Sequence, residues 1–241
     1  MEGLLVSIII PTLNAQRTLE QCLSLLLECP GGTEILICDG GSEDETLRIA
    51  ENKGKKVRIL DCSQEKGIYG AMNKGIEEAR GKWLYFCGAD DFIAEPCVFT
   101  KALEGVTEKT DLVIGRVRNL PPRHKRVKEW YEPTWGSMLL LSNQVHHQGA
   151  IYHSRIFQNY RYPTEYKVFG DYHLNLMLWK QGVDVQFTQQ HIAEAGSDGI
   201  SKRFTSGLYK EEFRMKRGVL AFHEWFWQPI WLLLKYLRKQ I

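Results

Sequence analysis

The sequence predicts an α/β fold in which a mostly parallel central sheet is flanked by helices and followed by a helical C-terminal extension. In the first 115 residues, short apolar runs of strand length alternate with amphipathic helical segments. The runs are apolar on both faces, which is typical of strands buried between two layers of helices in a parallel sheet. From Leu208 onward the pattern is helical, basic and rich in Trp and Phe, and it predicts the extension.

The expected elements follow from local signals along the chain. Pro11 stops the first strand, since proline cannot donate to a sheet ladder. Strands are expected at residues 4–10, 35–38, 57–60, 83–87 and 112–114, with helices at 19–27, 44–53 and 68–79 between them. Beyond Gly115 the sequence predicts a basic loop at 116–128, strands at 149–153, 183–187 and 192–195, and a helix at 171–181. Gly182 ends that helix.

The composition is that of a folded soluble protein. Of the 241 residues, 44% are hydrophobic and 25% charged, which excludes a disordered, a collagen-like and a multi-span membrane protein. The net charge of +2 hides a division between two halves. Residues 1–111 carry 12 basic and 19 acidic residues, whereas residues 112–241 carry 19 basic and 10 acidic residues. The halves are therefore expected to have different partners.

The six cysteines all lie in the first half of the chain, without a CxxC pair or a zinc-type spacing. We expect them to be reduced and structural, as in a cytosolic protein. The first residues lack a basic n-region, so a signal peptide is not expected.

Polar residues follow the predicted strands, at the edge where parallel sheets bind ligands. Pro11, Thr12 and Asn14 follow the first strand, where neither a GxGxxG run nor a P-loop is present, so NAD and ATP sites of those kinds are disfavoured. Asp39 follows the second strand, and its carboxylate can accept from a base imide or a ribose hydroxyl. Ser42 and Glu45 have the spacing of a capping box, which explains Ser42 but does not require Asp39.

The fourth predicted strand is followed by the adjacent carboxylates Asp90 and Asp91. Adjacent carboxylates repel each other unless a divalent cation neutralises them, and Mg²⁺ or Mn²⁺ bound in this way completes its shell with water and phosphate oxygens. The structural alternative is that one of the two caps a following turn.

Seven short segments, in this order, carry a resemblance. They are SIIIPTLN (7–14), DGGSEDET (39–46), KGIYGAMNKG (66–75), ARG (79–81), GADD (88–91), HQG (147–149) and FGDY (169–172). Together they resemble the family 2 glycosyltransferases of the GT-A fold over about residues 6–201. The nearest resemblance is to bacterial enzymes that build O-antigen, capsule or exopolysaccharide.

The resemblance implies roles for single residues. The residues that would bind the nucleotide-sugar donor are Pro11, Thr12, Asn14, Asp39, Lys66, Asn73 and Asp90. Asp91 would hold Mg²⁺ or Mn²⁺, and His147 would contact the acceptor or the diphosphate. Asp171 would be the general base; because it opens a predicted helix, it is alternatively an N-cap, and the helix N-terminus is expected to lower its pKa.

Two positions depart from the family pattern. Gly88 stands where many relatives have an Asp, so metal binding rests more on Asp91. Residues 198–201 read Asp-Gly-Ile-Ser, where relatives often have Gly-Gly-Ile-Ser.

The resemblance also implies an activity and an organisation. The expected reaction is an inverting, metal-dependent transfer of a sugar from a UDP-, GDP- or dTDP-linked donor to a glycan or polyprenyl-linked acceptor, in cell-surface polysaccharide synthesis. Residues 1–201 would form the GT-A domain, with a donor half (1–115) and an acceptor half (116–201), and residues 202–241 a basic aromatic tail. The expected location is the cytoplasm, or the inner face of the membrane.

The tail leaves several partners open. Helices rich in Trp and flanked by Lys and Arg favour a membrane interface, and the alternatives are packing on the domain or on a second subunit in a homodimer. Residues 219–234 are too short and too polar to span a bilayer. The alternatives to a transferase are a nucleotide-sugar-binding pseudoenzyme that acts as a scaffold, and a nucleic-acid-binding module. The basic segments match no nucleic-acid motif, so no nucleic-acid partner is expected.

Overall fold

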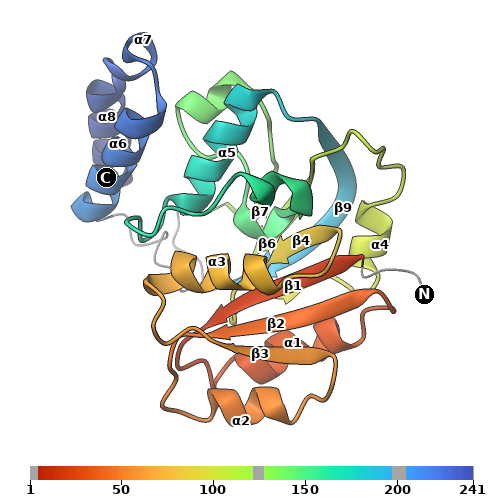
Figure 1. Cartoon of the computed structure of the whole chain (residues 1–241). Coiled ribbons are helices and arrows are strands. Elements are labelled where there is room, and N and C mark those ends of the chain that lie inside the picture. Colours follow the sequence, from red (N-terminus) through yellow and green to blue (C-terminus); the bar gives the residue numbers. More distant parts are fainter. Residues whose placement is uncertain (1–4, 122–127, 197–204, 241) are drawn as a thin grey trace.

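The computed structural model describes residues 5–121, 128–196 and 205–240. Within them, a nine-stranded sheet lies between helices in the order β3-β2-β1-β4-β8-β6-β9-β5, and β7 pairs with β6 (Figure 1). The strands are β1 (Val6–Thr12), β2 (Thr33–Asp39), β3 (Val57–Asp61), β4 (Trp83–Phe86), β5 (Phe92–Ile93), β6 (Leu112–Asn119), β7 (Trp130–Tyr131), β8 (Ala150–His153) and β9 (Val185–Ala195). The helices are α1 (Leu19–Leu27), α2 (Thr46–Glu51), α3 (Gly67–Glu78), α4 (Val98–Ala102), α5 (Gly170–Gln181), α6 (Ser206–Val219), α7 (Phe222–Trp225) and α8 (Gln228–Gln240), with 3₁₀ turns η1 (Ser137–Leu140), η2 (His147–Gly149) and η3 (Ser154–Gln158). The predicted α/β class and helical C-terminal segment are confirmed.

The sheet is parallel where strands and helices alternate. β1 pairs in parallel with β2 and β4, and β2 with β3. Successive β1 side chains point to opposite faces: Ile8 belongs to the core cluster that includes residues of α1 and α4, whereas Ile9 belongs to the cluster that includes residues of α3 and α5. Because these strands are parallel, the turns after β1, β2 and β4 lie at one edge of the sheet.

Beyond β4 the sheet is mixed. β8 is antiparallel to both β4 and β6, β5 is antiparallel to β9, and β6 and β9 are parallel. The physical reason is that the βα alternation stops near Gly115, and without helical crossovers neighbouring strands can run in opposite directions. The two short strands expected at 183–187 and 192–195 form one strand, β9.

Three local expectations are wrong. Pro11 was expected to stop the first strand, but β1 continues through it to Thr12. At Pro11 the strand pairs with β2 alone, so the missing N–H is tolerated as it is on an edge strand. Arg116 and Arg118 were expected in a loop but lie in β6, where their guanidinium groups lie 5.4 and 5.9 Å from the ring of Trp130. The rest of that basic segment, residues 122–127, lies outside the described residues. The capping box is absent because α2 begins at Thr46, and the Ser42 hydroxyl instead donates to Asp39 at 2.6 Å.

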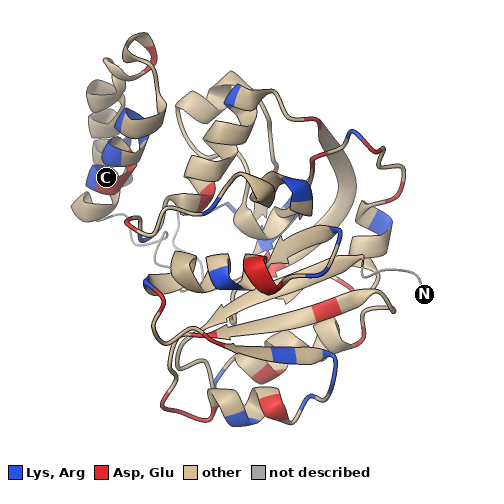
Figure 2. Ribbon diagram, in the orientation of Figure 1, with Lys and Arg blue, Asp and Glu red and all other residues tan. Residues whose placement is uncertain are grey.

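Buried and charged residues follow the expectations in part. All six cysteines are free; five are buried, and Cys97 is exposed. Figure 2 shows acidic and basic residues intermixed along the ribbon from this side, so the charge difference between the halves of the chain does not gather into one basic surface in this view. No helix in the described parts of the chain is both long and apolar enough to cross a membrane.

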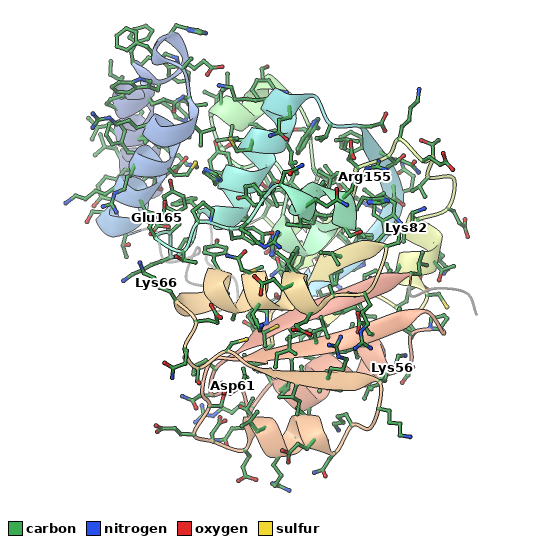
Figure 3. All side chains as sticks on the ribbon, in the orientation of Figure 1. Lys56, Asp61, Lys66, Lys82, Arg155 and Glu165 are labelled. Carbon is green, nitrogen blue, oxygen red and sulfur yellow. The ribbon has the colours of Figure 1, made fainter. Side chains whose placement is uncertain are left out.

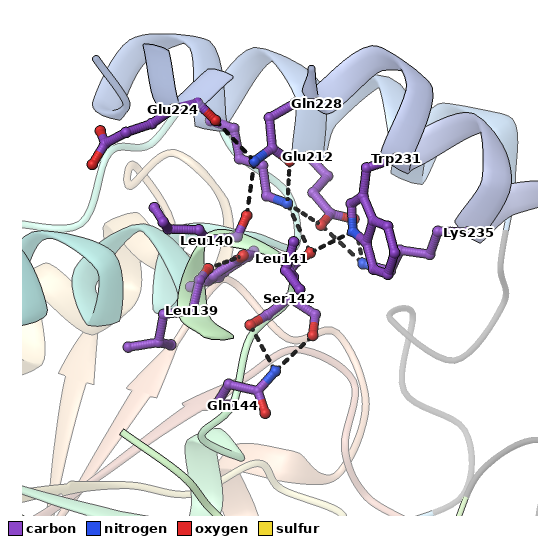
Figure 4. A network of polar contacts seen from close by, with 12 residues as sticks. Leu139, Leu140, Leu141, Ser142, Gln144, Glu212, Glu224, Gln228, Trp231 and Lys235 are labelled. Carbon is purple, nitrogen blue, oxygen red and sulfur yellow. Dashed lines mark hydrogen bonds and ion pairs between the residues drawn. The ribbon is translucent and has the colours of Figure 1, made fainter. Parts of the chain in front are cut away.

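The C-terminal helices are docked on the η1 region by a buried polar network (Figure 4). The Lys216 ammonium donates to the Leu141 carbonyl at 2.8 Å and to the Gln228 side chain at 3.0 Å, and it pairs with Glu212 at 3.2 Å. The Trp231 indole donates to the same carbonyl at 2.9 Å. One face of the tail therefore packs on the domain, as one of the weighed alternatives had it. The expected boundary at 201/202 lies outside the described residues.

Candidate active site

A cavity of about 470 Å³ lies at the edge of the sheet where β4 ends. Its lining comes from the N-terminal part of α3, the turn after β4, residues 143–148 and residues 167–171. Four of the predicted site residues line it, namely Asp90, Asp91, His147 and Asp171. The fold thus brings together residues from both halves of the chain.

Asp91 is a buried carboxylate, 5% exposed. It accepts hydrogen bonds from the amides of Gly88 at 3.1 Å and Gly196 at 2.9 Å, and from the side chain of Gln148. Burial and the neighbouring charge of Asp90 nevertheless raise the pKa of Asp91 to about 6. The ionised form is therefore less favourable here than in water, and a positive charge beside it would stabilise it.

Gly88 explains how the two carboxylates fit together. A Cβ at this position would lie 2.6 Å from Asp91 Oδ2 and 3.0 Å from Asp90 Oδ1, closer than side chains tolerate. The departure from the family pattern thus coincides with a close approach of both carboxylates to the backbone of residue 88.

The donor set fits a cation that shares its shell with a ligand. Two adjacent carboxylates at a cavity suit Mg²⁺ or Mn²⁺, which are held by one or two carboxylates together with water and phosphate oxygens. Within the described residues, no three His, Cys, Asp or Glu side chains gather to hold a metal by themselves. Asp91, with Asp90, would therefore provide the protein's ligands.

Asp171 lies in the first turn of α5 and not at its N-cap, which is Phe169. The Asn143 side chain donates to Asp171 Oδ2 at 3.0 Å. Burial raises the pKa of Asp171 to about 6, although backbone amides and Asn143 act in the opposite direction. The expected lowering of its pKa is wrong because burial outweighs the helix N-terminus. A carboxylate with this pKa is ionised at neutral pH and is still basic enough to accept a proton.

Asn143 was not found from the sequence, because it lies in none of the motifs. Its Oδ1 accepts from the Asn175 side chain at 3.1 Å and from the Val145 amide at 3.3 Å. Asn175 in turn accepts from the Tyr152 hydroxyl at 3.2 Å. These contacts fix the amide so that its NH₂ group faces Asp171.

His147 presents a neutral imidazole to the cavity. Its ring stacks on Phe86 with centroids 5.3 Å apart. Burial and the neighbouring His146 lower the pKa of His147 to about 3. Both ring nitrogens are buried and have no hydrogen-bond partner among the described residues, so one donor and one acceptor are unsatisfied.

The residues predicted to bind the nucleobase gather at a separate place, between the ends of β1 and β2. Asp39 is 3% exposed and accepts from the Gly41 amide at 3.0 Å, from Ser42 and from the Thr12 hydroxyl at 3.1 Å. Asn14 adopts a positive φ of 51°, and its side chain accepts from the Glu43 amide at 2.9 Å.

Pro11, Thr12, Asn14 and Asp39 are thus brought together, but they are not among the residues that line the cavity. Their role toward a donor stays a prediction.

Lys66 and Asn73 also lie outside the cavity lining. Lys66 is exposed at the N-cap of α3 (Figure 3). Asn73 clamps the backbone of Tyr162, donating to its carbonyl and accepting from its amide, both at 2.9 Å. Asn73 therefore has a structural role that the sequence did not predict, and the donor contacts of both residues stay predictions.

Residues 7–168 match the family model described as glycosyl transferase family 2. The chain belongs to this family, so it is a glycosyltransferase. A relative, the "PGL/p-HBAD biosynthesis glycosyltransferase" of Mycobacterium tuberculosis, is 34% identical over 189 residues, which cover 73% of this chain and 70% of the relative. An Escherichia coli relative, "UDP-Glc:alpha-D-GlcNAc-diphosphoundecaprenol beta-1,3-glucosyltransferase", is 33% identical over 38% of this chain and 37% of its own.

Solved structures share the fold at low sequence identity. TarS of S. aureus, in complex with UDP-GlcNAc, superposes with a TM-score of 0.69 at 18% identity, covering 88% of this chain and 65% of the TarS chain. A mannosyltransferase from Pyrobaculum calidifontis, in complex with GDP-Man and Mn²⁺, has a TM-score of 0.62 at 15% identity, covering 89% of this chain and 61% of its own. This chain thus spans about two thirds of the length of these structures.

Proposed function

We propose that the chain transfers a sugar, with inversion and with the help of Mg²⁺ or Mn²⁺, from a nucleotide-diphosphate donor to a hydroxyl group of a glycan or polyprenyl-linked acceptor. One observation carries the proposal: two carboxylates, the buried Asp91 and the half-buried Asp171, line one cavity, and the pKa values of both are raised to about 6. Asp91 is suited to bind a cation and Asp171 to accept a proton, and a metal-dependent inverting transfer uses both.

The residues divide the chemistry between them. Asp171 would take the proton of the acceptor hydroxyl as its oxygen attacks the anomeric carbon and the bond to the diphosphate breaks. Asn143 would hold the carboxylate in place. Asp91 and Asp90 would hold a divalent cation, which would supply positive charge against the negative charge of the leaving diphosphate. His147 would contact the acceptor or the diphosphate through its ring nitrogens, which are buried and have no hydrogen-bond partner among the described residues.

The relatives support the substrate class. The E. coli relative is named for a UDP-linked donor and a diphosphoundecaprenol-linked acceptor, and two structural neighbours are complexes with UDP-GlcNAc and with GDP-Man and Mn²⁺. A nucleotide-sugar donor and a lipid-linked acceptor in cell-surface polysaccharide synthesis are therefore proposed for this chain.

The outer face of the tail supports a peripheral position at the inner face of the membrane. The large apolar side chains exposed on it are Phe222, Phe226, Ile230, Leu233, Leu234 and Leu237. Their spacing of three and four residues places them along one side of the α7–α8 segment, a pattern that favours insertion at a bilayer interface. We expect the double variant Ile230→Gln/Leu233→Gln to sediment less with anionic liposomes. The matched control Leu13→Gln, at an apolar residue 62% exposed on the domain, should sediment as the wild type does. Equal sedimentation of all three would contradict membrane contact.

The activity is tested by a thermal-shift panel of UDP-, GDP- and dTDP-sugars with Mn²⁺ or Mg²⁺. A donor at 100 times its Kd should stabilise the fold by about 2.7 kcal/mol. The Asp91→Asn variant should lose the part of the shift that depends on the cation. A panel in which no nucleotide sugar raises the unfolding midpoint, with or without cation, would reject the proposal.

A further inference from the structure

The loop ahead of Asp171 is held by a carboxylate of the C-terminal helices. One oxygen of Glu211, on α6, accepts the amides of Lys167 at 2.9 Å, Val168 at 2.8 Å and Phe169 at 3.1 Å. A carboxylate that accepts three successive amides makes charge-assisted bonds, which are stronger than bonds between neutral groups. This contact was not predicted from the sequence.

Tyr69 holds the other side of the same loop. Its hydroxyl donates to the Val168 carbonyl at 2.6 Å and accepts from the Gly170 amide at 2.9 Å. A Cβ on Gly170 would lie 2.6 Å from the Tyr69 ring, so the ring packs directly on the backbone of the loop. The four successive amides of residues 167–170 are therefore all bonded, three to Glu211 and one to Tyr69.

The loop determines where Asp171 points. Lys167, Val168 and Phe169 line the same cavity as Asp171, and Asp171 follows directly as the second residue of α5. A displacement of about 1 Å in a catalytic group can lower a rate about 100-fold. Bonds that fix residues 167–170 therefore also fix the position of the carboxylate.

Glu211 is itself rigidly placed. The next residue, Glu212, is 1% exposed, and it pairs with Lys216 at 3.2 Å and with Lys235 at 2.8 Å. Figure 4 shows this network between the C-terminal helices and Leu141. α6 is thus anchored in the body of the protein one residue away from the contact with the loop.

We infer that Glu211 is a positioning residue for Asp171, which makes the C-terminal helices part of the catalytic apparatus and not an appendage to it. The inference rests on the proposed function for the role of Asp171. The contact between Glu211 and the loop does not depend on it. A division of the chain into an enzyme of residues 1–201 and a separate tail would then be incorrect in function.

The test compares Glu211→Ala with Glu165→Ala, a matched change at an exposed carboxylate just ahead of the same loop (Figure 3). Alanine suits the interior of α6, so the helix itself is not weakened. Hydrogen–deuterium exchange of the 165–171 peptide, measured without any substrate, should quicken at least tenfold in Glu211→Ala and stay unchanged in Glu165→Ala. Release of nucleoside diphosphate from the donor found by the panel, with Mn²⁺ and water as acceptor, should fall at least tenfold in Glu211→Ala. The midpoint shift that the donor produces should stay that of the wild type.

A conservative variant separates positioning from general damage to the fold. Glu211→Gln keeps an oxygen that can accept the same three amides, so it should restore most of the protection and most of the turnover. Unchanged exchange in Glu211→Ala, or wild-type turnover with quickened exchange, would overturn the inference. If Asp171→Asn turns over normally, the assignment of the base fails instead, while the exchange result still decides whether Glu211 orders the loop.

Discussion

Two acidic turns at the same edge of the parallel sheet differ in what surrounds their carboxylates. Asp39, the last residue of β2, accepts bonds from Thr12 and from the amides and hydroxyl of its own turn. Asp91, after β4, also accepts bonds, but burial and Asp90 raise its pKa to about 6. The same sequence signal, an aspartate near the end of a strand, thus has two outcomes. Asp39 holds its turn together through hydrogen bonds, whereas the carboxylate of Asp91 would be stabilised by a cation. Asp171, with its own raised pKa, belongs with Asp91.

The largest effect is expected at the cavity, from Asp171→Asn. Without a base for the acceptor hydroxyl, turnover should fall about 10²–10⁴-fold, while the donor-induced midpoint shift stays the same. Asp184→Asn, at an exposed carboxylate just beyond the other end of α5, is the control and should be as active as the wild type. Normal turnover by Asp171→Asn would show that Asp171 is not the base and would leave it a structural role like that of Asp39.

Stability should separate the two turns directly. Asp39→Asn removes a charged acceptor from several hydrogen bonds and should cost about 2 kcal/mol or more of the free energy of unfolding. The effect of Asp91→Asn on the free energy of unfolding should depend on pH. The folded-state pKa of Asp91, about 6, lies above its ordinary value of 3.8, so the folded protein binds the proton more tightly. This contribution is present below about pH 4 and is lost as the pH rises to about 6, a change of about 3 kcal/mol.

Urea unfolding of both variants at pH 4.5 and pH 7.5 measures this contrast. Relative to the wild type, Asp91→Asn should gain stability between the two pH values, whereas the loss in Asp39→Asn should persist at pH 7.5. If both variants lose stability equally at pH 7.5, the two turns do not differ as described.

A smaller effect is expected when the approach of the two carboxylates is obstructed. Gly88→Ala places a methyl group 2.6 Å from an oxygen of Asp91, so the carboxylate must move and the affinity for Mn²⁺ should fall about tenfold. Gly31→Ala, where an added Cβ meets nothing within 4 Å, is the control. Mn²⁺ titrations followed by the unfolding midpoint compare them. Equal Mn²⁺ affinities of the two variants would show that the turn after β4 accommodates the added methyl group without displacing Asp91.

The sequence predicted the parts of the molecule in which local signals and topology agree. The apolar runs located β1 to β4, and parallel strands place the residues that follow them at one edge. The order and direction of β8, β6 and β9 in the sheet depend on pairing between distant segments, and local periodicity carries no information about that pairing. The raised pKa of Asp171 was not predictable from local sequence either, because it results from burial in the folded chain, which outweighs the effect of the helix N-terminus.

The supporting residues of the site were beyond prediction for a related reason. Asn143 and Glu211 are polar residues outside every motif, and only the folded chain brings them to Asp171 and to the loop ahead of it. Asn73, by contrast, lies within a motif, and its amide holds the backbone of Tyr162. The motifs contain four residues that line one cavity, and they gave no information about which residues hold them in place.

The smallest expected effect concerns one of these supporting residues and appears only in a pH profile. Asn143→Ala removes the bond to Asp171 Oδ2, and this bond lowers the pKa of Asp171, so in the variant the pKa should rise from about 6 by about one unit. Because the base must be ionised, turnover should be about fivefold lower at pH 6 and nearly equal to that of the wild type at pH 8.5. Gln144→Ala, the neighbouring amide, which donates to Ser142, should leave the profile in place. A loss of turnover of equal size at every pH would mean that Asn143 supports the fold of the cavity and does not lower the pKa of Asp171. Asn143 would then have a structural role, like the residues that hydrogen-bond to Asp39.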